Sequence, residues 1–135
     1  MSTSIRYPAV AGALLAVLSV SPAVSALDDS SFNYKTTKDL LEVCSAGPDV
    51  KDQEAAAFAC RAFIVATVQY HDAVSDRKKM KRLICYPESA TVATARDAFL
   101  AWGKKNAGNA QRMNEAPVVG LVRALAEASP CKPSK

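Results

Sequence analysis

The sequence of 135 residues contains one histidine and no Cys-x-x-Cys pair. Structural zinc sites combine four cysteine and histidine ligands at short spacings, whereas the four cysteines here are separated by 16, 25 and 46 residues. A glycine-rich phosphate loop, a Gly-x-Ser-x-Gly elbow and a His-Glu-x-x-His motif are also absent, and no two carboxylates stand out as an acid and a base. We therefore expect no metal, no cofactor and no catalytic residue, and we interpret the protein as a binding or structural module, not an enzyme.

His71 leaves one catalytic alternative open. A histidine that faces a cysteine thiolate is the arrangement of a nucleophilic enzyme, and His71 follows Tyr70 on a predicted helix. An even number of cysteines in an exported chain favours disulfides for all four, which would leave no thiolate. The favoured interpretation is an ordinary histidine at the surface or at the boundary of the core.

Residues 1–26 have the three parts of a secretory signal peptide. Arg6 supplies the positive start, Ala9–Val20 is an apolar run of 12 residues, and the segment Val24–Ala26 offers small residues for cleavage at its end. A membrane-spanning helix needs about 20 apolar residues, so an uncleaved anchor is the disfavoured alternative. We expect residues 27–135 to form one domain in the oxidising periplasm, without a membrane span. Its net charge of +3 is too mild to favour nucleic acid as a partner.

Signals for strands are few, because no run alternates apolar and polar residues for long and no Asn-Gly or Asp-Gly turn occurs. Signals for helices predict four of them, joined by short loops, and so a small all-α domain built as a four-helix bundle. Their predicted starts are Thr36 or Thr37, Asp49 or Asp52, Thr91, and Asn114, the last with Pro117 in the first turn.

The predicted core follows from the apolar faces of these helices. On the second helix, six residues recur at alternating spacings of four and three, which places them on one face. They are Ala56, Cys60, Phe63, Thr67, Tyr70 and Val74. We expect the core to contain Phe63, Tyr70, Phe99, Val122 and Leu125.

Four cysteines allow three disulfide pairings, and their positions at helix ends favour one. Cys44 closes the first helix and Cys60 lies early in the second, so an antiparallel hairpin brings the two together. Cys85 precedes the third helix and Cys131 follows the fourth, which places both at one end of a second hairpin. The favoured pairs are therefore Cys44–Cys60 and Cys85–Cys131, one cross-link for each hairpin.

A basic stretch spans residues 77–82 and contains five cationic side chains. The favoured interpretation is a solvated helix end. The sharper alternative is a surface that binds an acidic partner or an anionic membrane. Its residues are Arg77, Lys78, Lys79, Lys81 and Arg82.

The context of the cysteines resembles a known family. Leu40-Leu41-x-x-Cys44, Cys60-x-x-Phe63-Ile64, Ile84-Cys85-x-Pro87 and Pro130-Cys131 follow one another along residues 34–131. This order is similar to the Rap/Tai family of type VI secretion amidase immunity proteins. The resemblance implies an all-helical periplasmic domain with an HdeA-like fold, which binds and blocks a peptidoglycan amidase effector, often as a homodimer. Two positions depart from the family pattern: Phe63 stands where a tyrosine is usual, and Ala66 where a glycine is usual.

The resemblance also suggests where such an inhibitor would bind its target. A protein that plugs an enzyme cleft needs a rigid scaffold and a protruding loop, and the polar loop 106–113 is our candidate. The candidate partner-binding residues are Lys104, Lys105, Asn106 and Arg112. An ordinary solvated connection between helices is the alternative for this loop. For the whole protein, the alternatives are a periplasmic stress chaperone of the HdeA type and an envelope protein with an unknown partner.

Overall fold

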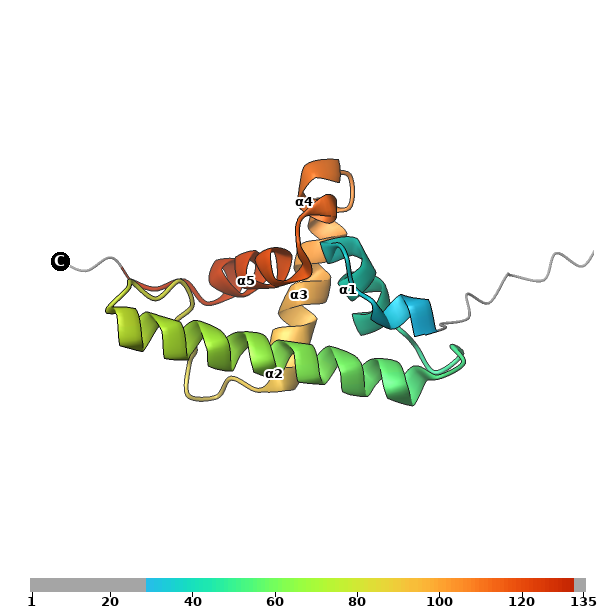
Figure 1. Ribbon diagram of the computed structural model, residues 1–135, viewed down its shortest axis with the longest axis horizontal. Coiled ribbons are helices and arrows are strands. Elements are labelled where there is room, and N and C mark those ends of the chain that lie inside the picture. Colours follow the sequence, from blue (N-terminus) through green and yellow to red (C-terminus); the bar gives the residue numbers. More distant parts are fainter. Residues whose placement is uncertain (1–28, 133–135) are drawn as a thin grey trace, which may run out of the picture.

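The computed structural model describes residues 29–132 (Figure 1). The predicted signal peptide, residues 1–26, lies outside the described residues. Within the described range the chain forms helices and no strand, and its one extended pairing is an isolated bridge between Ile84 and Pro130. The all-α prediction is therefore confirmed. The elements are η1 (Asp29–Phe32), α1 (Thr37–Cys44), α2 (Gln53–Lys78), α3 (Val92–Asn106), α4 (Ala110–Asn114) and α5 (Pro117–Ala128).

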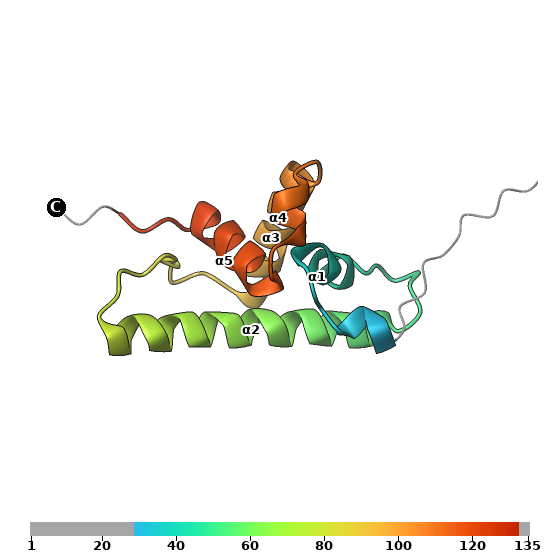
Figure 2. The same cartoon turned by 45° about the horizontal axis from the view of Figure 1, so that its top comes forward.

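The long helix α2 lies along one side of the molecule, and the other helices all lie on the same side of it (Figure 2). Helices α1 and α3 pack against α2, and α5 packs against both α1 and α3. Helix α3 runs across α2 and carries α4 at its far end (Figure 1). The arrangement thus differs from the antiparallel bundle expected by default, because α3 crosses α2 and does not lie alongside it.

Helix starts were the most accurate local prediction. Thr36 forms a capping box with Asp39: the Thr36 Oγ1 accepts the Asp39 N–H at 3.2 Å, and the Asp39 carboxylate accepts the Thr36 N–H at 2.8 Å. Burial alone would raise the pKa of Asp39, but hydrogen bonds from Thr36 and Lys35 hold that pKa below its ordinary value. Thr91 forms the same kind of box with Thr94 at the start of α3.

One expected start is wrong, and another is confirmed without a capping hydrogen bond. The fourth predicted helix does not begin at Asn114, which is the last residue of the short helix α4. A new helix, α5, begins at Pro117, whose missing N–H is no loss in a first turn. Asp52 is the residue before α2, but its backbone is left-handed and its side chain makes no capping hydrogen bond.

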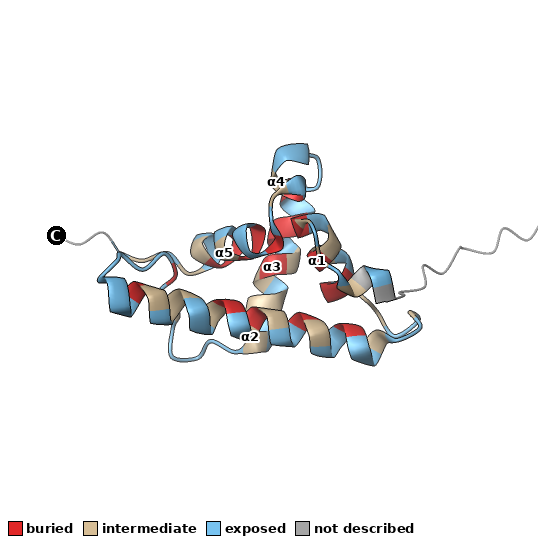
Figure 3. Ribbon diagram, viewed as in Figure 1, coloured by how far each residue is buried: buried red, intermediate tan, exposed pale blue. Residues whose placement is uncertain are grey.

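The core fills the space between α2 and the helices that cover it (Figure 3). Phe99 and Leu125 are buried as predicted, whereas Phe63 and Val122 are half-buried. The prediction was wrong for Tyr70, whose exposed fraction is 71%. The predicted residues do share one face, because their spacing averages 3.6 residues, but the face that is buried is rotated from it toward Ile64 and Ser75, and Tyr70 falls outside it. The residues of α2 that are buried are Ala56, Cys60, Ile64, Thr67 and Ser75.

Both disulfides join the cysteines that the helix ends bring together. Cys44 bonds to Cys60 inside the core, where both residues are buried. Cys85 bonds to Cys131 near the end of α5, beside the bridge between Ile84 and Pro130. The first cross-link fixes α1 on α2, and the second ties the segment after α2 to the end of α5.

We predict that Phe99→Ala lowers the free energy of unfolding by about 3–5 kcal/mol, because Phe99 is fully buried and its removal leaves a cavity. Urea unfolding measures this loss. Leu83→Ala is the control, since Leu83 is exposed and its truncation should change stability by less than about 0.5 kcal/mol. Equal losses for the two variants would contradict the placement of Phe99 in the core.

Candidate partner-binding site

The candidate loop 106–113 forms a compact tip on the end of α3. Residues 110–114 of this region are helix α4, so most of the predicted polar loop is helical. The Asn109 side chain caps α4 by accepting the Arg112 N–H at 3.1 Å. The tip lies at the end of α3 that is remote from α2 (Figure 1). A projection of this kind is the shape that a plug for an enzyme cleft requires.

Two of the four candidate residues are available to a partner. Lys104 and Lys105 lie in the last turn of α3, are exposed, and form no ion pair with another described residue. Their position suits the negative end of the helix dipole. Both ammonium groups are therefore free to meet an acidic surface.

The other two candidates hold the tip together. The Asn106 side chain is buried: its Nδ2 donates to the Trp102 carbonyl at 2.8 Å, and its Oδ1 accepts from Arg112 Nη1 at 2.6 Å. The Arg112 guanidinium also lies over the Trp102 ring, 5.9 Å from its centroid. The Trp102 Nε1–H in turn donates to the Glu127 carboxylate at 3.1 Å. This network links α3, α4 and α5, so the tip has a fixed shape.

A groove of about 390 Å³ lies beside the tip, between α1, α3 and α4. Gly103 allows α3 to approach α1 closely there, because a Cβ at this position would overlap the Leu41 side chain. The groove is mostly apolar inside and carries charged side chains at its edge. Sequence reasoning missed it, because its two walls are about 60 residues apart in the chain. Its lining residues are Lys38, Leu41, Glu42, Ser45, Leu100, Gly103, Lys104, Ala107 and Met113.

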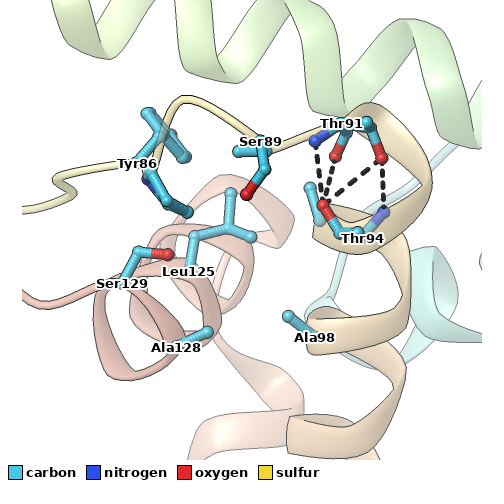
Figure 4. A pocket seen from close by; sticks show the side chains of 11 residues that line it. Tyr86, Ser89, Thr91, Thr94, Ala98, Leu125, Ala128 and Ser129 are labelled. Atoms are coloured by element: carbon cyan, nitrogen blue, oxygen red, sulfur yellow. Dashed lines mark hydrogen bonds between the residues drawn. The ribbon is translucent and has the colours of Figure 1, made fainter.

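A second hollow of about 240 Å³ lies between the start of α3, the end of α5 and the segment before α3 (Figure 4). Its hydroxyl groups belong to Ser89, Thr91, Thr94, Ser129 and Tyr86, and no histidine or carboxylate lines it. A nucleophilic hydroxyl needs a base within hydrogen-bond reach. Burial raises the pKa of Tyr86 to about 12, so its phenol stays protonated at neutral pH. The lining of this hollow therefore offers no acid and base pair.

His71 serves the fold. Its ring is 8% exposed, its Nδ1 lies 2.9 Å from the Asp72 carboxylate, and its Nε2 accepts the Leu83 N–H at 3.2 Å. Because Nε2 is an acceptor, Nδ1 carries the proton. All four cysteines are in disulfides, so the Cys–His alternative has no thiolate. Across residues 29–132, no three metal-ligating side chains are grouped as a metal site, and no helix is long and apolar enough to cross a bilayer.

We predict that Arg112→Gln lowers the free energy of unfolding by about 1–3 kcal/mol, because it removes the contact with Trp102 and leaves the buried Asn106 oxygen without its donor. Lys105→Gln is the matched control and should change stability by less than about 0.5 kcal/mol. Urea unfolding compares the two. Equal stability of both variants would show that the Arg112 contacts do not hold the tip.

No curated protein and no solved structure matches the chain. The sequence model of the Rap1a immunity proteins matches residues 36–131, a range that contains all four cysteines and every helix from α1 to α5. The match covers more than half of the chain. The protein therefore belongs to the family of Rap1a immunity proteins.

Proposed function

We propose that this immunity protein neutralises a peptidoglycan amidase effector of type VI secretion by binding it in the periplasm. The observation that carries the proposal is the rigid cationic tip, α4 with the last turn of α3, on a chain of the Rap1a immunity family. The two disulfides support the periplasmic location, because disulfides persist in oxidising compartments. The inhibitor acts by occupancy and performs no chemistry of its own.

The tip suits an inhibitor for a physical reason. An ordered loop loses little conformational freedom when it binds, so more of its contact energy appears as affinity. Here Asn106 and Arg112 fix the tip from inside, while Lys104 and Lys105 face the solvent. The apolar groove next to Lys104 offers area that a partner side chain could fill. The tip and the groove together form a surface with a charged rim and an apolar centre, as protein interfaces have.

A periplasmic stress chaperone of the HdeA type is the second candidate. It is favoured by one observation, the exposure of two large aromatic residues of α2, Phe58 and Tyr70. Such chaperones release apolar surface on partial unfolding, which two disulfides oppose in this chain. An assay of the aggregation of a client protein in acid separates the two candidates. A chaperone suppresses that aggregation, whereas an inhibitor of one enzyme does not.

We predict that the double variant Lys104→Glu, Lys105→Glu weakens inhibition at least tenfold while it lowers the free energy of unfolding by only about 1–2 kcal/mol, the cost of two carboxylates at the negative end of the helix dipole. Exposed charges contribute little to stability but steer and orient a charged partner. The double variant Lys35→Glu, Lys51→Glu is the control, since these exposed lysines lie before α1 and α2 and give the same change in net charge.

The deciding experiment expresses the protein in the periplasm together with each candidate amidase from the same genome. Protection from lysis by the unchanged protein and by the control, but not by the tip variant, supports the proposal. Equal lysis with and without the protein, for every such amidase, would reject the amidase as target.

We further propose that the protein acts as a homodimer through the outer face of α2. This face carries small side chains and one large aromatic, and the described chain does not cover it. Ala66, where the family pattern has glycine, lies on it and has no helix of its own chain nearby to crowd it. The exposed apolar residues of this face are Ala55, Phe58, Ala62, Ala66 and Ala73, and the exposed polar residue Gln69 lies among them.

We predict that Phe58→Glu converts the homodimer into a monomer, because it places two carboxylates in an apolar contact. Sedimentation velocity measures the mass. Met80→Glu is the control, an exposed residue outside this face, and should leave the mass unchanged. A monomeric mass for the unchanged protein at the highest soluble concentration would refute the dimer.

A further inference from the structure

The chain makes a tight turn where α2 ends. We call residues 77–83 the basic turn. The Met80 N–H donates to the Ser75 carbonyl at 2.9 Å and the Lys79 N–H to the Asp76 carbonyl, which is the hydrogen-bond pattern of a Schellman motif. Lys79 occupies its left-handed position, with a φ of 49°, where glycine is the usual residue. The left-handed residue therefore adds a further lysine to this turn.

The basic turn carries more positive charge than its neighbours neutralise. Arg82 pairs with Asp76 at 2.9 Å and lies 3.9 Å from Asp72, so both nearby carboxylates are engaged. The remaining cations are exposed and form no ion pair with another residue of the described chain. They are Arg77, Lys78, Lys79 and Lys81.

Two apolar side chains stand among these cations. Met80 is 58% exposed and Leu83 is 57% exposed. A solvated helix end needs only polar and charged side chains, so these two exposed apolar residues require another explanation. Cations that surround exposed apolar side chains are the composition of surfaces that bind anionic bilayers, where the cations contact headgroups and the apolar groups enter the boundary with the acyl chains.

The basic turn is held in place by the rest of the fold. The Leu83 N–H donates to His71 Nε2, and Arg82 is bound to Asp76 on α2. The disulfide between Cys85 and Cys131 anchors the chain two residues after Leu83. Met80, Leu83 and the lysines are thus presented together by an ordered turn.

We propose that the basic turn docks the protein on an anionic phospholipid surface. An acidic protein is less well suited as the occupant, because it would pair with the cations but leave Met80 and Leu83 in water. Each cation near an anionic surface raises membrane affinity by about fivefold. Four together give a gain on the order of several hundred-fold, enough for reversible binding without a covalent anchor. The turn lies at the end of α2, away from α4, so docking leaves the tip free (Figures 1 and 2).

The test uses the protein recovered from the periplasm after export, with both disulfides formed, and measures its cosedimentation with vesicles. Vesicles of phosphatidylglycerol and phosphatidylcholine are compared with vesicles of phosphatidylcholine alone. The variant Lys78→Gln, Lys81→Gln should bind the anionic vesicles about 25-fold more weakly. The control Lys35→Gln, Lys51→Gln changes net charge equally, at exposed lysines outside the basic turn, and should bind like the unchanged protein.

A second variant separates membrane docking from simple charge attraction. Met80→Ser, Leu83→Ser keeps every cation, and it should abolish the binding that persists at about 0.5 M salt, where electrostatic attraction is screened. Because both residues are exposed, the variant is expected to fold. Polyglutamate is the probe for an acidic protein. Equal binding of both vesicle types, equal loss in the control variant, or retention on polyglutamate without retention on anionic vesicles would each overturn the proposal.

Discussion

The buried disulfide between Cys44 and Cys60 is the constraint on which the other contacts depend. Helix α1 has eight residues, too few to be stable alone. The cross-link holds it on α2, and on the chain-entropy model a loop of 16 residues contributes about 3 kcal/mol to stability. Helix α1, held in this way, contacts both the segment before α5 and α5 itself. The Thr37 N–H and hydroxyl donate to the Glu115 carbonyl, and Gly120 lets α5 approach because a Cβ there would overlap Thr37.

The same helix shapes the candidate site. Leu41 of α1 forms one wall of the groove, and Gly103 of α3 allows the close contact that places this wall beside the tip. The tip itself depends on buried polar contacts, because Asn106 is satisfied only if Trp102 and Arg112 are both in place. Its rigidity therefore derives from a polar network that runs from the buried Asn106 to the partly exposed Arg112 and Glu127, because directional hydrogen bonds favour one geometry.

The sequence predicted those features that depend on neighbours in the chain. Capping boxes at Thr36 and Thr91 need only residues three positions apart, and the helix ends were enough to favour both cysteine pairs. Periodicity was less reliable for α2, because apolar residues occur around much of this helix and the buried face is rotated from the predicted one. Tyr70 was assigned to the core for this reason, although it is exposed, and the buried Ile64 was not predicted.

The candidate site was predictable only in part. The polar composition of residues 106–113 marked the tip, but it could not separate Lys105, which faces solvent, from Asn106, which is buried one position later. That distinction depends on the helical rotation of α3 and on the arrival of Arg112 from α4 and Glu127 from α5. The groove could not be predicted from the sequence, because it forms only where α1 packs beside α3 in the folded chain.

The tip, the outer face of α2 and the basic turn lie on different parts of one framework. Helix α2 alone is about 39 Å long for its 26 residues. One disulfide ties α1 to α2, and the other ties the segment after the basic turn to the chain after α5. A ligand at one surface changes affinity at another only if it favours one of two global arrangements. The core between these surfaces is cross-linked by the buried Cys44–Cys60 disulfide, which opposes a second arrangement. Substitutions at the three surfaces should therefore act independently, because sites farther apart than about 10 Å without shared partners contribute additively.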